Sequence, residues 1–105
     1  MDKEALFARR LGTQVVELDA GPVIVRALSR GEAMSLRGKE MPVEEMERRL
    51  LALAMVDPAM TEDDVRQWQE ASPAGEIETV TNAVLKVSGM EVRADREAYR
   101  RFRKR

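Results

Sequence analysis

Acidic residues gather at two places in the chain where they could bind a divalent cation or act as an acid and a base. One cluster lies within residues 44–47, just before two arginines, and the other is Glu62-Asp63-Asp64. Both lie where a helix is expected to begin, and carboxylates in a first turn are stabilised by the helix dipole. The second cluster also lacks the alternating acidic ligands and the glycine of a calcium loop. We interpret both clusters as helix starts and predict no metal site.

Nucleophiles and general bases are scarce in the sequence. Neither cysteine nor histidine occurs. Their absence removes a cysteine nucleophile, a disulfide framework, the usual zinc ligands and the commonest general base near neutral pH. No histidine can activate a serine, and Ser29 and Ser72 are expected to cap helices. Glycines occur singly, without a phosphate-binding loop. The sequence therefore predicts a protein that is not an enzyme and has no cofactor.

Methionine is frequent, with seven in 105 residues. Flexible thioethers let a surface accept varied apolar partners, although they also fill gaps in cores. We expect Met46 and Met55 in the core, because they share the apolar stripe of one helix. Trp68, on a helix with little other apolar content, either completes the core or anchors a partner. The candidate partner-binding residues of the folded body are Met41, Met60, Trp68 and Met90.

Charge divides the chain into an acidic body and a basic end. Residues 1–88 carry 16 acidic and 11 basic side chains, whereas residues 89–105 carry three acidic and seven basic ones. We place the domain boundary near Met90, so that residues 1–90 form a single domain and residues 91–105 a basic, flexible tail. The tail is either simply solvated or binds nucleic acid or an acidic partner. Its candidate binding residues are Tyr99, Arg100, Arg101 and Phe102.

The elements that must position these residues are a hairpin and a set of helices. β-Branched residues on both sides of residues 19–22 predict a β-hairpin within residues 13–28. A short, loosely held helix could precede it within residues 2–10. Helices are expected after the hairpin at residues 29–37, 42–56, 61–71 and 73–87. The predicted fold class is α+β and mostly α: an N-terminal β-hairpin, about four short helices and a basic C-terminal tail.

Segment 42–56 carries the longest helical pattern. Its apolar residues recur at helical spacing, and the residue before Pro58 is expected to end the helix. We expect Leu50 and Leu53 to lie in the core, because both belong to this broad apolar stripe. The helix before it should begin with a capping box formed by Ser29 and Glu32.

A membrane span or a secretory signal is not expected. No run approaches the roughly 18 apolar residues that a span needs, and residues 1–10 lack the apolar stretch of a signal peptide. We therefore expect a soluble intracellular protein.

Several motifs follow one another in a distinctive order. VRALSRGEA ends the hairpin, Val56-Asp57-Pro58 precedes Thr61-Glu62-Asp63-Asp64-Val65, Pro73-Ala-Gly-Glu-Ile77 begins a helix, and Val87-Ser88-Gly89-Met90 closes the pattern. In this order and at this size, the chain resembles the tail assembly chaperones of long-tailed bacteriophages over roughly residues 15–90. The basic end at 91–105 lies outside the resemblance.

The resemblance implies a non-enzymatic helper encoded by a phage or prophage. Such a protein binds the long, helical tape measure protein, keeps it soluble and helps to recruit tail tube subunits. It would act in the cytoplasm of the bacterial host and be absent from the mature virion. In many members a programmed ribosomal frameshift yields a longer second isoform, and the oligomeric state is left open.

A second function class remains beside this one. The basic tail would suit a small nucleic-acid-binding or regulatory protein, but the acidic body argues against that class, because a dedicated binder usually shows a basic face on its folded domain. The resemblance therefore favours the chaperone.

Overall fold

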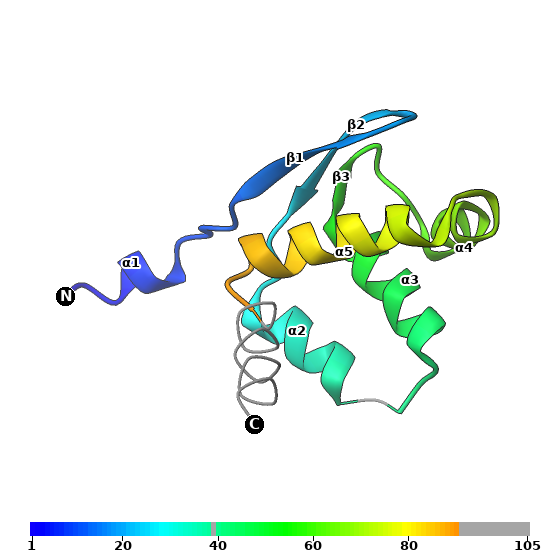
Figure 1. The fold of residues 1–105 in the computed structure, drawn as a ribbon. Helices are drawn as coiled ribbons and strands as arrows, with labels where there is room; N and C mark the ends of the chain where they lie inside the picture. The colour runs from blue at the N-terminus through cyan, green and yellow to red at the C-terminus, as the bar shows by residue number, and fades with distance from the viewer. Residues whose placement is uncertain (39, 91–105) are drawn as a thin grey trace, which may run out of the picture.

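The computed structural model describes residues 1–38 and 40–90, and in this part of the chain the fold is α+β and mostly α, as predicted (Figure 1). The candidate tail residues Tyr99, Arg100, Arg101 and Phe102 lie outside the described residues. The elements in chain order are α1 (Glu4–Phe7), β1 (Thr13–Leu18), β2 (Gly21–Arg26), α2 (Arg30–Arg37), α3 (Val43–Ala54), β3 (Met55–Asp57), α4 (Glu62–Ala71) and α5 (Ala74–Val87).

The predicted hairpin is present and forms two strands of an antiparallel sheet. β1 and β2 pair from Thr13 opposite Arg26 to Leu18 opposite Gly21, which leaves a two-residue turn at residues 19–20. Gly21 has a φ of 134° at the end of this turn, a value that favours glycine because it has no Cβ. Pro22 lies near the start of β2, as expected for a residue without an amide donor.

A third strand, β3, was not predicted. The sequence suggests one helix over residues 42–56, but α3 ends at Ala54 and Met55–Asp57 pairs with β2, Met55 opposite Val25 and Asp57 opposite Ile24. Val56 lies between these two pairs, where the register shifts. A β-branched residue and a residue before proline both disfavour helix, and the pairing with β2 satisfies the backbone in an extended form.

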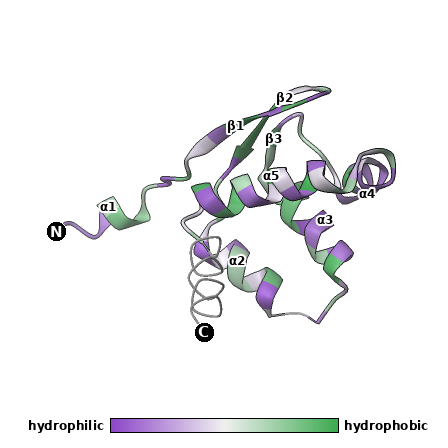
Figure 2. Cartoon of the chain, in the orientation of Figure 1, coloured by the Kyte–Doolittle hydropathy of each residue, from purple (hydrophilic) through white to green (hydrophobic). Residues whose placement is uncertain are grey.

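The core lies between one face of the sheet and the helices. Its largest fully buried side chains come from four elements, β2, α3, α4 and α5, and are Val25, Leu51, Val65, Val80 and Val84. Figure 2 shows the strong apolar character of β2 and the alternation of apolar and polar residues around α3. Every helix and strand except α1 supplies at least one buried apolar side chain to the same cluster, which holds these elements together.

The inward face of α3 differs in part from the predicted one. Leu50 is buried as predicted, but Leu53 is 37% exposed and is not a core residue. Leu51 and Ala54 are fully buried instead. On a helix of 3.6 residues per turn, residues 50, 51 and 54 share one face while residue 53 lies at its edge. Met55 is buried as predicted, although from a strand, and Met46 is only half-buried.

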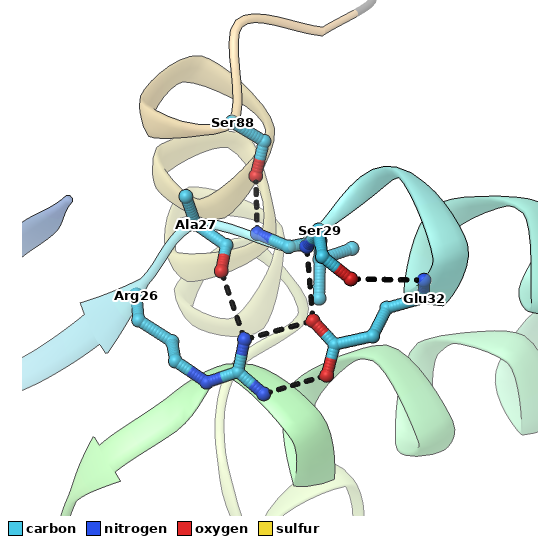
Figure 3. Close-up of polar contacts among 6 residues, drawn as sticks. Arg26, Ala27, Ser29, Glu32 and Ser88 are labelled. Atoms are coloured by element: carbon cyan, nitrogen blue, oxygen red, sulfur yellow. Dashed lines mark hydrogen bonds and ion pairs between the residues drawn. The ribbon is translucent and has the colours of Figure 1, made fainter. Parts of the chain in front are cut away.

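A polar cluster joins the end of β2 to α2 and α5 (Figure 3). The predicted capping box is present: the Ser29 hydroxyl accepts from the Glu32 amide and the Glu32 carboxylate accepts from the Ser29 amide. Arg26 donates two hydrogen bonds to the same carboxylate, at 2.9 and 2.8 Å. Ser88 accepts from the Leu28 amide at 2.8 Å. These hydrogen bonds therefore fix the backbone at the junction between β2 and α2.

Helix ends elsewhere follow the sequence in most places. Thr61 and Asp64 form a capping box at the start of α4, which confirms the interpretation of that acidic cluster as a helix start. Gly89, with a φ of 73°, closes α5, and its neighbour Met90 donates to the Leu85 carbonyl at 2.8 Å. The prediction for Ser72 is wrong: its hydroxyl donates to the Trp68 carbonyl at the end of α4 and does not cap α5.

Residues 1–38 and 40–90 include no helix with the length and apolar content that crossing a bilayer requires.

Candidate functional site

An apolar groove lies where the hairpin turn meets β3, α4 and α5. We call it the Trp68 groove, after the largest side chain in its wall. It is open to solvent and has a volume of about 370 Å³, near the lower end of the range for ligand pockets. Its lining residues are Leu18, Ala20, Gly21, Pro22, Val23, Met55, Pro58, Met60, Trp68 and Glu76.

Trp68 is held in the groove by hydrogen bonds of both its side chain and its backbone. The indole Nε1 donates to Oε2 of Glu76 at 2.7 Å. The ring packs against the core cluster and stays half-buried. At the backbone, the Trp68 carbonyl accepts from the Ser72 amide and hydroxyl at 3.0 and 2.7 Å. A half-buried indole with a fixed polar end offers an apolar face to a partner at little cost in side-chain entropy.

Met60 adds an adaptable side chain to this rigid wall. It lies in the loop between β3 and α4, half-buried, and packs against the same core cluster. Thr61 directly after it fixes the backbone through the capping box of α4. An unbranched thioether can change rotamer to fit different apolar surfaces. The groove therefore combines one fixed and one adaptable apolar contact.

Two of the four candidate residues of the body thus lie together, and two lie elsewhere. Met41 is half-buried in the link between α2 and α3. Met90 lines a second, more polar pocket of about 390 Å³, which includes Leu28, Ala33 and Ser88. The structure therefore brings Met60 and Trp68 together and gives Met41 and Met90 no part in the Trp68 groove.

Sequence reasoning missed the hairpin side of the groove. Leu18, Pro22 and Val23 form that side, and Glu76 of α5 orients the indole. The alternation of the strands could have indicated that Leu18 and Val23 share the inward face with Val16 and Val25. Met34 was also not singled out, although it is 56% exposed on α2 and lies outside the groove.

The groove carries little charge of its own. Glu76 is the one ionisable residue among those that line it, and its carboxylate accepts from the indole. Asp19 and Asp57 are exposed and adjoin lining residues in sequence. Nearby on α4, the hydrogen bonds from Arg66 and then from Gln67 lower the pKa of Asp63 below its ordinary value. The groove is therefore apolar at its base, with acidic residues around it.

Across residues 1–38 and 40–90, no three side chains among Asp, Glu, His and Cys come together as metal ligands would. The Trp68 groove instead offers an apolar surface for contact with another molecule. Comparisons of the chain with protein-family models, with curated proteins and with solved structures return no match.

Proposed function

We propose that this protein is a phage tail assembly chaperone, which binds and solubilises the tape measure protein and helps to recruit tail tube subunits. The observation that carries the proposal is the Trp68 groove, an exposed apolar site on an α+β domain of this size. The order of motifs between residues 15 and 90 supports the same function. The site of action would be the cytoplasm of the bacterial host, before the mature virion forms.

The groove suits a client that presents apolar stripes on helices. A helix laid across a groove inserts side chains at positions i and i+3 or i+4. Trp68 would contact such a side chain with its apolar face, while Met60 would adjust to residues of different size. A chaperone must bind many similar apolar helix faces weakly and must not select one sequence. An open groove that contacts its client mainly through apolar side chains fits that need.

Charge supports the solubilising half of the proposal. Residues 12–90 carry fourteen acidic and eight basic side chains. The whole chain has a formal net charge of only −1, because residues 91–105 are basic. The excess of acidic groups on the body would surround a covered client helix with charged surface and so favour its solubility.

Co-expression tests this function. The tape measure protein from the same gene neighbourhood should remain soluble with this chain and precipitate without it. Met60→Gln keeps the side chain nearly the same size and makes it polar, so it should reduce the soluble client several-fold. Met34→Gln is the matched control, because Met34 is exposed on α2 outside the groove. Met34→Gln should unfold at the same denaturant concentration as the parent protein, and Met60→Gln, whose side chain packs against the core cluster, should unfold at a lower one but stay folded at the temperature of the co-expression.

Two outcomes would contradict the proposal. If the client is equally soluble with Met60→Gln and with Met34→Gln, the Trp68 groove does not bind the client. An insoluble client, together with nucleic-acid binding that weakens steeply with salt, would favour the alternative function of a nucleic-acid-binding or regulatory protein that uses its basic tail.

A further inference from the structure

The N-terminal arm, residues 1–11, carries an apolar pair that nothing in the described chain covers. Phe7 is 74% exposed and Leu6 is 54% exposed, both on the single-turn helix α1. Residues 1–10 are all exposed, and Figure 1 shows α1 projecting away from the rest of the domain. Two adjacent apolar side chains that are more than half exposed are costly, because fully burying one such side chain contributes about 1.5–3 kcal/mol and these two realise only part of that.

The arm is anchored at one end of the domain, and the Trp68 groove lies at the other. The Gly12 carbonyl accepts from the Ala27 amide at 2.8 Å, which fixes the point where the arm leaves the fold. From there β1 runs to the hairpin turn, and the groove begins at Leu18. Arm and groove are therefore separated by the whole length of β1.

The arm is barely long enough to reach the groove of its own chain. From Gly12 to Leu18 the strand covers about 20 Å. From Gly12 back to Phe7 there are five residue steps, which span at most about 18 Å when fully extended. To reach that groove, the arm would have to extend fully and also reverse direction before Gly12. Docking in the groove of another molecule requires neither change.

Charge is complementary between the two surfaces. Within the arm, Arg9 and Arg10 follow the apolar pair, whereas Asp2, Lys3 and Glu4 precede it. Glu76 lines the groove, and the exposed residues Asp19 and Asp57 adjoin lining residues in sequence. The two arginines after the apolar pair are therefore complementary to these acidic residues, and this match would speed association and set the direction in which the arm lies.

We propose that the N-terminal arm of one copy of this chain docks in the Trp68 groove of a second copy, with Phe7 and Leu6 against Trp68 and Met60. The interface is heterologous, because the arm and the groove are different surfaces of the same molecule. Two copies can exchange arms reciprocally, or each copy can pass its arm to the next. The small apolar area makes the contact weak and reversible, so a client could displace the arm from the groove.

Cysteine cross-linking tests the contact directly, because the natural chain has no cysteine. A tagged Ala8→Cys protein, which keeps Leu6 and Phe7, is mixed with an untagged Met60→Cys or Ala20→Cys protein under mild oxidation, without any client. A disulfide-linked pair of one tagged and one untagged chain is expected with at least one of the two groove positions. Val43→Cys replaces Ala8→Cys in the control, because Val43 is 79% exposed and lies at the start of α3.

Cross-linking of Val43→Cys to the groove positions as fast as Ala8→Cys would overturn the proposal, and so would no cross-link at either groove position. A disulfide within one chain of the double variant Ala8→Cys/Ala20→Cys, in place of a link between chains, would also overturn it.

Sedimentation gives a second measurement that does not depend on disulfide geometry. The full-length protein should self-associate, and Phe7→Ala should raise the dissociation constant by about tenfold or more. Val43→Ala should leave it unchanged. The proposal would be overturned if the two variants had equal dissociation constants, or if the parent protein stayed monomeric at millimolar concentration. Since neither experiment includes a tape measure protein, their failure would leave the chaperone function to be judged by its own co-expression test.

Discussion

The indole nitrogen of Trp68 and the carboxylate of Glu76 meet at 2.7 Å across the turn between α4 and α5. The two residues are eight positions apart, on different helices, and the hydrogen bond sets the orientation of the largest side chain in the groove. Ser72, midway between them, donates to the Trp68 carbonyl at the end of α4. The α4–α5 turn is thus built around the tryptophan.

Glu76→Leu should loosen the indole. The indole would then have only water as an acceptor, and the loss of a charge-assisted hydrogen bond at a half-exposed site should cost about 0.5–1.5 kcal/mol of unfolding free energy. The emission of Trp68, the one tryptophan of the chain, should shift in the folded state. Glu78→Leu is the control, because Glu78 is exposed on the same helix. Identical emission and stability in both variants would show that the hydrogen bond does not position the ring.

Leu51 and Leu53 should differ strongly in their contribution to stability. Leu51→Ala removes a fully buried side chain and should cost about 2–5 kcal/mol. Leu53→Ala removes a side chain that is more than a third exposed and should cost less than about 1 kcal/mol. Urea unfolding of both variants measures the difference. Equal losses would mean that the inward face of α3 includes residue 53.

Acid should weaken the junction between β2 and α2. The hydrogen bonds from Arg26 lower the pKa of Glu32 to about 2, from an ordinary value of 4.5. A folded pKa below the unfolded one means that this contribution to stability is present above about pH 4.5 and is lost as the pH falls toward 2. Glu32→Gln should therefore cost about 1–3 kcal/mol at pH 7, and the cost should shrink in acid.

The measurement is denaturant unfolding of both proteins at several pH values between 7 and 2.5, with Glu78→Gln as the control. The difference in unfolding free energy between Glu32→Gln and the parent protein should shrink as the pH falls. If it stays constant over this range, the stabilisation by the Arg26–Glu32 pair does not depend on the carboxylate charge.

Two glycines, one in the first turn of α5 and one just after its last turn, should respond to alanine with opposite signs. Gly89 adopts a φ of 73°, which an alanine tolerates poorly, so Gly89→Ala should destabilise the domain by about 1 kcal/mol. Gly75 lies in the first turn of α5 with open space at its Cβ position, so Gly75→Ala should stabilise it by about 0.5 kcal/mol. Thermal unfolding of the two variants checks both signs. A stabilising Gly89→Ala would show that residue 89 does not need the left-handed conformation.

Local signals in the sequence predicted most of the helix and hairpin boundaries correctly. Ser29 with Glu32, and Thr61 with the acidic residues after it, begin α2 and α4 through contacts within four residues of each other. The hairpin turn likewise depends on Gly21 and on the β-branched residues beside it. Contacts at such short range are encoded by neighbouring residues, so a single sequence suffices to predict them.

Contacts between distant segments account for what sequence reasoning missed. Met55–Asp57 is a strand because β2, some thirty residues earlier, supplies the backbone partners, and no local pattern encodes that pairing. Leu51 is buried and Leu53 exposed because α4, α5 and the sheet cover one side of α3, whereas the apolar stripe of the helix is wide enough for either orientation. The Trp68 groove needs residues from the hairpin, the β3–α4 loop and both last helices. The sequence identified Met60 and Trp68 as candidates from their residue types. That they line the same groove depends on packing between segments far apart in the sequence, which hydrophobic periodicity and secondary-structure propensity do not encode.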